Sequence, residues 1–224
     1  MSALFLTATG TDIGKTFIAA GLIRELRRRG RAAAALKPVA SGFEEWSAPA
    51  SDPARLLDAL GLPATAEEMA RIAPWRFRAP LSPDMAAARE GRRIDFAELV
   101  AFCRGEVAAR ADVLLIEGIG GVMVPLDERH TVLDWMAAVG VPALLVAGSY
   151  LGTISHSLTA LGALRQRGLA VAALVVSETE GSAVPLDDTV ASIARFADGV
   201  PVVPLPLLPP GADDGAFARI ADLL

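Results

Sequence analysis

The sequence predicts an α/β fold in which a parallel β-sheet is flanked by helices on both sides. Two observations lead to this prediction: short, almost uniformly apolar runs recur along the chain, and helical stretches separate them. Strands that are apolar throughout must be covered on both faces, as in a parallel sheet between helical layers. The length of 224 residues and the hydrophobic content of 53% suit one domain, residues 1–224, with a large core.

The N-terminal elements follow from apolar runs and from the residues that interrupt them. An apolar run at 3–7 predicts the first strand, and an amphipathic stretch at 15–29 predicts a helix that Gly30 ends. The alanine-rich run at 32–36 predicts the second strand. Between residues 42 and 110 the pattern is mostly helical, with candidate helices at 52–60, 66–72, 83–90 and 95–109.

The C-terminal half alternates strands with helices, because each short apolar run is followed by a longer amphipathic stretch. Strands are expected at residues 113–116, 142–147, 170–176 and 200–205. Helices are expected at residues 132–139, 153–167, 186–197 and 212–224.

Composition excludes several classes of function. No apolar run reaches the ~20 residues of a membrane-spanning helix, so no membrane partner is expected. A net charge of −5 and a pI near 5.1 argue against nucleic acid as a partner. Residues 1–6 lack the features of a signal peptide, and the single cysteine, Cys103, fits a reducing compartment. A cytoplasmic location is therefore expected.

The segment after the first strand, Thr-Gly-Thr-Asp-Ile-Gly-Lys-Thr at 9–16, is typical of a phosphate-binding loop, or P-loop. Backbone N–H groups in this segment can surround phosphate oxygens at the start of the following helix. Lys15 would reach the outer phosphates and Thr16 would hold Mg²⁺. The strict pattern has glycine where this chain has Thr9, and the alternative is an ordinary glycine turn. The motif indicates a P-loop NTPase-like domain.

Lysine is rare in this chain, with two lysines against nineteen arginines, and both lysines lie in such loops. A lysine retained in an arginine-rich chain suggests a position that needs a compact ammonium group. Lys37 directly follows the second strand and precedes proline, which holds its backbone extended. Lys37 and Ser41 would both face an anionic group. The alternative is a solvent-exposed loop lysine. If Lys37 is chemical rather than structural, Lys37→Gln should change stability by no more than about 1 kcal/mol, as expected for a change in a surface loop.

Two carboxylates are candidate metal ligands. Glu117 ends an apolar strand beside the glycine turn 118–121, where a phosphate-bound Mg²⁺ needs an oxygen ligand. The alternative for Glu117 is a carboxylate that caps the next turn. Asp52 is ambiguous, because Ser51-Asp52-Pro53 is also an ordinary helix start, and on the residues alone the helix cap is the favoured interpretation.

The motifs together resemble the dethiobiotin synthetase family, which closes the ureido ring in biotin biosynthesis with ATP. The combination of Lys-Pro-Val-x-Ser-Gly with Glu-Gly-x-Gly-Gly is more specific than a P-loop alone. The matching segments follow in family order over almost the whole chain: residues 9–16, 37–42, 51–52, 80–83, 117–121 with 125–126, and 151–156.

The resemblance implies a homodimer with the substrate site at the subunit interface. The substrate would be 7,8-diaminononanoate, whose amine takes up CO₂ as a carbamate. A carbamate oxygen would attack the γ-phosphate of ATP to give a carbamic–phosphoric anhydride. The second amine would then close the ring and expel phosphate.

The resemblance also implies roles for individual residues. Lys15 and Lys37 would neutralise the carbamate and the transferring phosphoryl group, with Thr11 and Ser41 bonding the carbamate or the diamine. Mg²⁺ would be held by Thr16, Asp52 and Glu117, which replaces the helix-cap interpretation of Asp52. The substrate carboxylate from the other subunit would bind at Gly152, Thr153, Ile154 and Ser155. The implied nucleotide contacts are Asp12, Ile13, Gly14, Lys15, Thr16, Phe17, Asp52, Glu117, Gly118, Ile119, Gly120, Ser177, Glu178, Pro206, Leu207, Leu208 and Asp213.

Five residues, at four places in the chain, depart from the family pattern. Ala8 stands where the family usually has glycine, and Asp84 replaces a common histidine. Ser177 with Glu178 stands where an Asn-Asp pair often reads adenine, and Pro204 replaces a common glutamate. The last two changes leave nucleotide selectivity open.

Two alternative hypotheses involve protein classes with the same α/β architecture. The partition and septum-site ATPases are binding and assembly modules, but they carry a second lysine early in the P-loop, where this chain has Gly10. This chain also lacks a basic surface for DNA and an amphipathic tail for membranes. A cobyrinate-type amidotransferase would need a glutaminase domain with a nucleophilic cysteine, and Cys103 has no such context.

Overall fold

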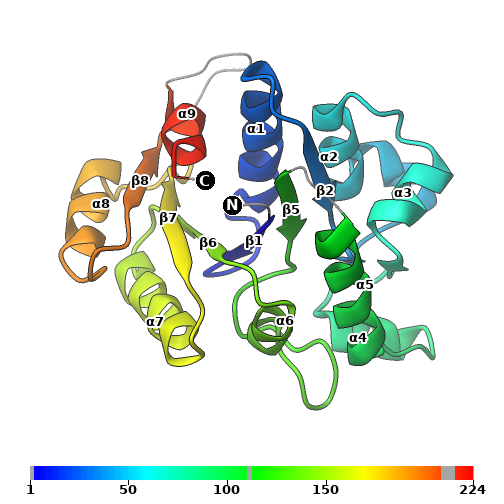
Figure 1. The fold of residues 1–224 in the computed structure, drawn as a ribbon. Helices are drawn as coiled ribbons and strands as arrows, with labels where there is room; N and C mark the ends of the chain where they lie inside the picture. The colour runs from blue at the N-terminus through cyan, green and yellow to red at the C-terminus, as the bar shows by residue number, and fades with distance from the viewer. Residues whose placement is uncertain (1–2, 110–112, 208–214, 224) are drawn as a thin grey trace.

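The six-stranded sheet at the centre of the protein is entirely parallel, in the order β2-β5-β1-β6-β7-β8 (Figure 1). This arrangement was obtained from a computed structural model that describes residues 3–109, 113–207 and 215–223, without the side chains of 45–47. The expected parallel α/β fold is confirmed. The strands are β1 (Ala3–Ala8), β2 (Ala33–Leu36), β5 (Val113–Glu117), β6 (Ala143–Gly148), β7 (Val171–Ser177) and β8 (Val202–Leu205).

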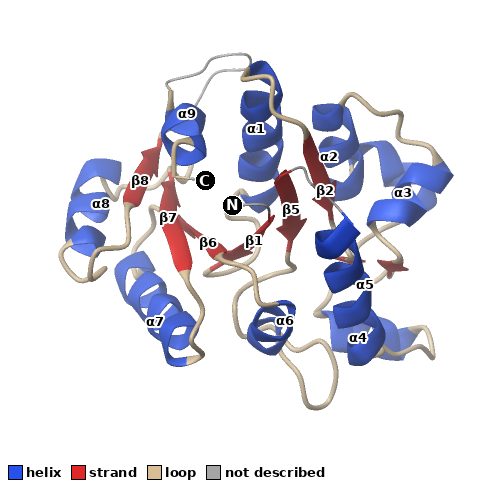
Figure 2. Ribbon diagram, viewed as in Figure 1, coloured by secondary structure: helices blue, strands red, loops and turns tan. Residues whose placement is uncertain are grey.

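Helices cover both faces of this sheet, as Figures 1 and 2 show. On one face α1 packs between α2 and α9, while α5, α6, α7 and α8 cover the other. The helices are α1 (Lys15–Arg28), α2 (Asp52–Leu60), α3 (Ala66–Ile72), α4 (Pro83–Arg89), α5 (Phe96–Ala109), α6 (Val132–Val139), α7 (Thr153–Gln166), α8 (Leu186–Ala194) and α9 (Ala216–Ala221). None of the described helices is long and apolar enough to cross a membrane.

The segment between β2 and α4 differs from the expectation of helices alone. It contains a second, two-stranded parallel sheet formed by β3 (Val39–Ala40) and β4 (Trp75–Arg76), and a short 3₁₀ helix, Glu45–Ala50. Two-residue strands carry no periodicity, so the sequence pattern could not reveal them. Their pairing ties the segment after Lys37 to residues that lie far along the chain.

The helix ends follow local rules that are visible in the sequence. Thr131 caps α6 in a reciprocal capping box with Asp134. Gly61 and Gly140 end α2 and α6 in left-handed conformations, which cost glycine little. Differences from the expected boundaries are a few residues: α8 ends at Ala194 rather than at 197, and residues 215, 222 and 223 of the expected last helix lie outside α9. Residues 212–214 and 224 of the expected last helix lie outside the described residues.

The core lies on both faces of β1, in which all six residues are buried. Phe5 of β1 meets the ring of Trp135 edge to face, with 4.7 Å between ring centroids. Cys103 of α5 is fully buried, and burial raises the pKa of its thiol to about 12. This buried central strand sets the position of the loop that follows it.

Candidate active site

The P-loop follows β1 and is shaped by its glycines. Gly14 has a φ of 97°, a left-handed conformation that places the start of α1 at Lys15. Lys15 reaches back across the loop, and its Nζ donates to the backbone oxygen of Gly10 at 3.2 Å. Within the described residues, the N–H groups of 10–14 make no hydrogen bond to another backbone group. These donors are therefore free to meet an anion.

The three expected loops meet because β2, β5 and β1 are neighbours in the sheet, with Leu6 of β1 paired to Glu117 of β5. Glu117 Oε1 accepts hydrogen bonds from the Thr16 hydroxyl at 2.7 Å and from Lys37 Nζ at 2.6 Å. Lys37 Nζ also lies 3.1 Å from Asp52 Oδ2. The sheet thus brings Thr16, Lys37, Asp52 and Glu117 into one cluster.

Burial makes this cluster electrostatically strong. The side chains of Lys37 and Glu117 are only 3% and 1% exposed. Burial alone would lower the pKa of Lys37, but the carboxylates of Glu117 and Asp52 outweigh it and raise that pKa. Burial likewise acts to raise the pKa of Asp52, whereas Lys37 and then the Thr16 hydroxyl lower it overall. Burial, and after it the charge of Lys37, lowers the pKa of Lys15 to about 8.

At this cluster the structure excludes the alternative for Lys37 and the helix-cap interpretation of Asp52. Lys37 is not a solvent-exposed loop lysine, so the expectation of a small stability change in Lys37→Gln has lost its basis. Asp52 is not the cap of α2, because Ser51 occupies the N-cap position and Asp52 is the first helical residue. The carboxylate of Asp52 instead points to Lys37.

The glycine turn after β5 packs directly on the P-loop. A Cβ at Gly121 would lie 3.2 Å from the backbone of Thr9, and Val122 N–H donates to the oxygen of Ala8 at 3.0 Å. The hydroxyl of Thr11 faces the same turn, 3.6 Å from where a Cβ on Gly120 would be. Glycine at these positions lets the two loops approach closely.

The donor set suits a hard divalent cation. Glu117 Oε2 is buried and has no hydrogen-bond partner in the described part of the chain, which leaves one carboxylate oxygen open. Two carboxylates and a hydroxyl are oxygen ligands of the kind that Mg²⁺ prefers, with phosphate and water completing the shell. The described residues contain no cluster of three His, Cys, Asp or Glu side chains, so an all-protein metal cage is not seen there. The residues present fit a metal that is shared with a nucleotide.

Ser41 is followed by a turn that packs on the segment 80–83. Gly42 N–H donates to the oxygen of Ala79 at 3.1 Å, and a Cβ on Gly42 would lie 3.3 Å from Pro80. Further along this segment, Ser82 Oγ and Asp84 Oδ1 are buried with no hydrogen-bond partner in the described residues. The structure therefore places the segment 80–83 beside the turn that follows Ser41.

The ends of β7 and β8 lie on the other side of the P-loop. Ser177 Oγ is 3.4 Å from where a Cβ on Gly14 would be, so Ser177 sits against the loop. Glu178 accepts the N–H of Leu207 at 2.8 Å and donates its own N–H to Leu205. These bonds connect the β7 and β8 ends ahead of Pro206 and Leu207. Leu208 and Asp213 lie outside the described residues.

One aromatic contact near this edge was not anticipated from the sequence. Phe17, which is 47% exposed, meets the ring of Phe217 at 5.7 Å between centroids. Phe217 fits because α1 carries Gly21, where a Cβ would lie 2.1 Å from the ring. Glycine inside a helix is the signal that could have indicated this close packing.

The start of α7 is a separate group of residues. Gly152 has a φ of 97°, and the Thr153 hydroxyl donates to Gly148 at 2.6 Å. Tyr150 Oη lies 3.0 Å from His156 Nδ1, and Leu151 is 91% exposed. Within the described residues, no hydrogen bond or ion pair joins residues 152–155 to Lys37 or Glu117 of the same chain.

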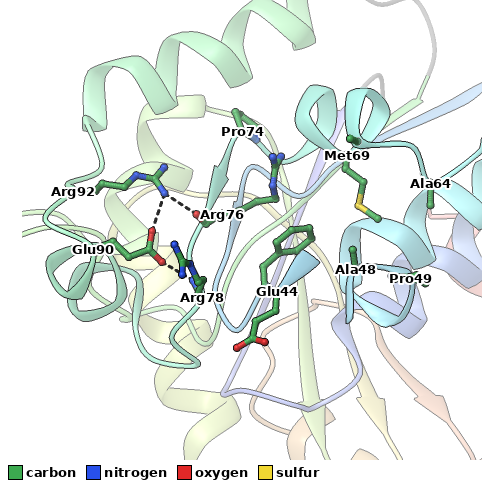
Figure 3. Close-up of a pocket in the computed structure, with 12 residues that line it drawn as sticks. Glu44, Ala48, Pro49, Ala64, Met69, Pro74, Arg76, Arg78, Glu90 and Arg92 are labelled. Atoms are coloured by element: carbon green, nitrogen blue, oxygen red, sulfur yellow. Dashed lines mark hydrogen bonds and ion pairs between the residues drawn. The ribbon is translucent and has the colours of Figure 1, made fainter. Parts of the chain in front are cut away.

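A cavity of about 1020 Å³ lies beyond β3 and β4 (Figure 3). Its arginines are held by their neighbours: Arg92 bonds Glu90 at 3.0 Å and the oxygen of Arg76 at 2.9 Å. None of the expected site residues lines it. The described lining residues are Phe43, Glu44, Ala48, Pro49, Ala64, Ala66, Met69, Pro74, Arg76, Arg78, Glu90 and Arg92.

Similarity to known proteins establishes the family. A family model described as an AAA domain matches residues 2–209. The ATP-dependent dethiobiotin synthetase BioD of Acidiphilium cryptum is 54% identical over 202 residues, covering 90% of this chain and 91% of that protein. The enzyme of the same name from Caulobacter sp. strain K31 is 51% identical over 221 residues, covering 97% and 93%. The chain belongs to the dethiobiotin synthetase family. The function implied by the resemblance, that of an ATP-dependent dethiobiotin synthetase, is confirmed.

Solved structures show how widely the fold of this dethiobiotin synthetase family member is shared. The cell division ATPase MinD of Pyrococcus furiosus matches with a TM-score of 0.53 at 15% identity, covering 100% of this chain and 98% of that one. The MinC:MinD complex of Aquifex aeolicus matches with a TM-score of 0.56 at 12% identity, covering 98% and 86%. At such identities the likeness shows the fold alone. The P-loop NTPase-like fold is therefore confirmed, and the septum-site reading gains no support from it.

Proposed function

We propose that this chain forms dethiobiotin from 7,8-diaminononanoate, CO₂ and MgATP. One amine adds to CO₂ as a carbamate, a carbamate oxygen attacks the γ-phosphorus, and ADP leaves. The second amine then attacks the carbamate carbon, and the C–O bond to phosphate breaks to release phosphate. The observation that carries the proposal is the meeting of Lys15, Thr16, Lys37, Asp52 and Glu117 beside the P-loop.

Charge neutralisation and positioning supply most of the catalysis in phosphoryl transfer. Lys15 and the free N–H groups of the P-loop would hold the β- and γ-phosphates. Lys37 would neutralise the carbamate and the transferring phosphoryl group, while Thr11 and Ser41 would bond the carbamate or the diamine. These side chains come from the ends of β1 and β2, which are brought to one edge of the sheet.

Thr16, Asp52 and Glu117 would hold Mg²⁺. Bound there, Mg²⁺ would offset the negative charge of the β- and γ-phosphate oxygens. Support comes from the unpartnered Oε2 of Glu117 and from the all-oxygen donor set.

The base end of the nucleotide would lie between the β7 and β8 ends. Asp12, Ile13, Gly14 and Phe17 would line the phosphates and sugar from the P-loop side, with Gly118, Ile119 and Gly120 on the β5 side. Ser177, Glu178, Pro206 and Leu207 would contact the base, together with Leu208 and Asp213 of the segment outside the described residues. This placement is supported by the position of Ser177 against Gly14 and by the hydrogen bond from Leu207 N–H to Glu178.

The functional unit would be a homodimer in the cytoplasm, with the substrate carboxylate held by the partner's residues 152–155. The N-terminus of a 14-residue helix is a sound anion site: the Thr153 N–H bonds Tyr150, but within the described residues those of Ile154 and Ser155 bond no backbone group. Leu151 and Ile154 beside this helix start are 91% and 37% exposed, apolar side chains that a second copy would cover. Specific activity should then fall on dilution in step with the dissociation measured by light scattering. A fully active monomer would contradict the dimeric site.

Mass spectrometry tests the reaction directly. The protein is incubated with diaminononanoate, MgATP and ¹³C-bicarbonate, and the cyclic urea should carry the heavy carbon while ADP and phosphate form in equal amounts. Glu117→Gln serves as the matched inactive control, checked first for folding by circular dichroism. ATP hydrolysis without labelled cyclic urea would refute the proposal.

A further inference from the structure

The Lys37 ammonium contacts both carboxylates that are proposed to hold the metal, and also a backbone oxygen of the following glycine turn. Lys37 Nζ lies 2.6 Å from Glu117 Oε1, 2.9 Å from the oxygen of Gly118 and 3.1 Å from Asp52 Oδ2. An ammonium group has three donors and no acceptor, so these contacts use its full capacity. No donor is left to reach a carbamate or a phosphate from this position.

The Thr16 hydroxyl is hydrogen-bonded to the carboxylate of Glu117 as well. It donates to Glu117 Oε1 at 2.7 Å, the oxygen that Lys37 also contacts. A metal between Thr16, Asp52 and Glu117 would need the lone pairs of all three groups. The ammonium therefore contacts both carboxylates that are proposed to hold the cation, while Glu117 Oε2 stays open.

A divalent cation and this ammonium would repel each other in the cluster. Both would lie within a few ångströms of Glu117 and Asp52 in a site where Lys37 is 3% exposed, and like charges repel strongly where water is excluded. A second cation, Lys15, is already close to Lys37, because the charge of Lys37 contributes to lowering the pKa of Lys15. This repulsion would favour departure of the Lys37 side chain when the metal enters.

The backbone of Lys37 is fixed, which confines the movement to the side chain. Lys37 N–H donates to Ile72 at 2.9 Å, and the oxygen of Pro38 accepts from Trp75 at 3.0 Å. The flexible four-carbon stem of lysine permits such a swing, whereas the wide, planar guanidinium of arginine would not fit three acceptors around one nitrogen. This need accounts for a lysine in a chain that uses arginine nearly everywhere else.

We propose that the Lys37 ammonium is the resident counter-cation of the metal position, and that metal entry displaces it toward the phosphates. The inference rests on the proposed function of the cluster as a Mg²⁺ site. Lys37 then neutralises the reacting groups only when the metal is in place. Metal binding and release of the ammonium toward those groups are therefore one event. ADP without metal leaves Lys37 on Glu117 and Asp52.

The lysine content of the chain allows a direct test by NMR. Protein labelled with ¹³C at the lysine ε carbons has two lysine signals, from Lys15 and Lys37. The Lys37 signal is the one absent from the Lys37→Arg variant. Spectra are taken with ADP plus a chelator and with MgADP, at equal ionic strength and at saturation of the protein with nucleotide. Lys15 should shift in both samples and Lys37 only in the sample with Mg²⁺.

The two lysine signals distinguish failure of the proposed exchange from failure of the proposed nucleotide site. If Lys15 responds to ADP but Lys37 shifts equally with and without Mg²⁺, or in neither sample, the exchange is wrong and the nucleotide site stands. If neither signal responds to ADP, the proposed nucleotide function fails and the exchange with it. In Glu117→Gln, the Mg²⁺-specific shift of Lys37 should disappear, and its persistence would place the metal elsewhere.

A second measurement uses metal affinity. Mn²⁺ binding in the presence of ADP, followed by electron paramagnetic resonance, should be tighter by about tenfold in Lys37→Met, because the metal no longer breaks charge-assisted hydrogen bonds. Lys37→Arg keeps the positive charge and is the matched control, in which affinity should not rise. Equal tightening in both variants, or none in Lys37→Met, would overturn the exchange.

Discussion

Replacing Lys37 by glutamine should unfold the protein far more readily than a loop substitution would. The ammonium is buried against Glu117 and Asp52 at 2.6 and 3.1 Å. Removing one member of a buried ion pair costs about 3–5 kcal/mol, because the remaining charge stays buried without its partner. Glu117 keeps the Thr16 hydrogen bond, and Asp52 is 45% exposed, so the lower end of this range is expected.

A loss of about 3 kcal/mol corresponds to a fall in Tm of about 6–12 °C for a chain of this size. A typical domain has about 5–15 kcal/mol of stability, so the variant should still fold. Urea unfolding followed by circular dichroism, in metal-free buffer, measures the loss. Arg104→Gln removes an exposed arginine of α5 and should change stability by no more than about 0.5 kcal/mol.

A double-mutant cycle isolates the pair itself. Lys37→Gln combined with Glu117→Gln removes both charges, so the double variant should be more stable than the sum of the single losses predicts. A coupling of about 1–3 kcal/mol is expected for groups in direct contact. If Lys37→Gln loses less than about 1 kcal/mol, or if the two changes are additive, the buried pair does not carry the energy assigned to it.

Three further results are expected. Asp52→Asn should raise the Mg²⁺ concentration needed for half-maximal activity, with partial recovery at high Mg²⁺; unchanged Mg²⁺ dependence would remove Asp52 from the metal site. Ser177→Asn should increase discrimination for ATP over GTP and CTP, measured as kcat/KM, by about 1–2 kcal/mol, since an amide offers the base both a donor and an acceptor; a parent that already excludes both would contradict this. Because burial raises the pKa of Cys103 to about 12, a thiol reagent should label it only as the protein unfolds, and rapid labelling of the native protein would show that the thiol is accessible.

The sequence determined most of the fold because its signals are local. The apolar runs of β1, β5, β6 and β7 fall where strands lie, and the ends of α2, α3 and α6 were predicted to the residue. Caps and glycine stops act within one helical turn, so they can be read from neighbouring letters. The two-stranded sheet of β3 and β4 was missed because each strand owes its existence to the other, 36 residues away in the register of Val39 with Trp75.

For the candidate site, the sequence identified Lys15, Thr16, Lys37 and Glu117 as separate motifs, and the family resemblance was needed to add Asp52. Only the tertiary structure decided that these residues touch, because contact depends on the order of β2, β5 and β1, which no local pattern specifies. Because of the same strand order, Lys37, which the sequence places in a loop, forms a buried ion pair with Glu117. Residue type and spacing determine which chemistry is available, whereas burial and distance, which set the energies, arise from strands that are far apart in the chain.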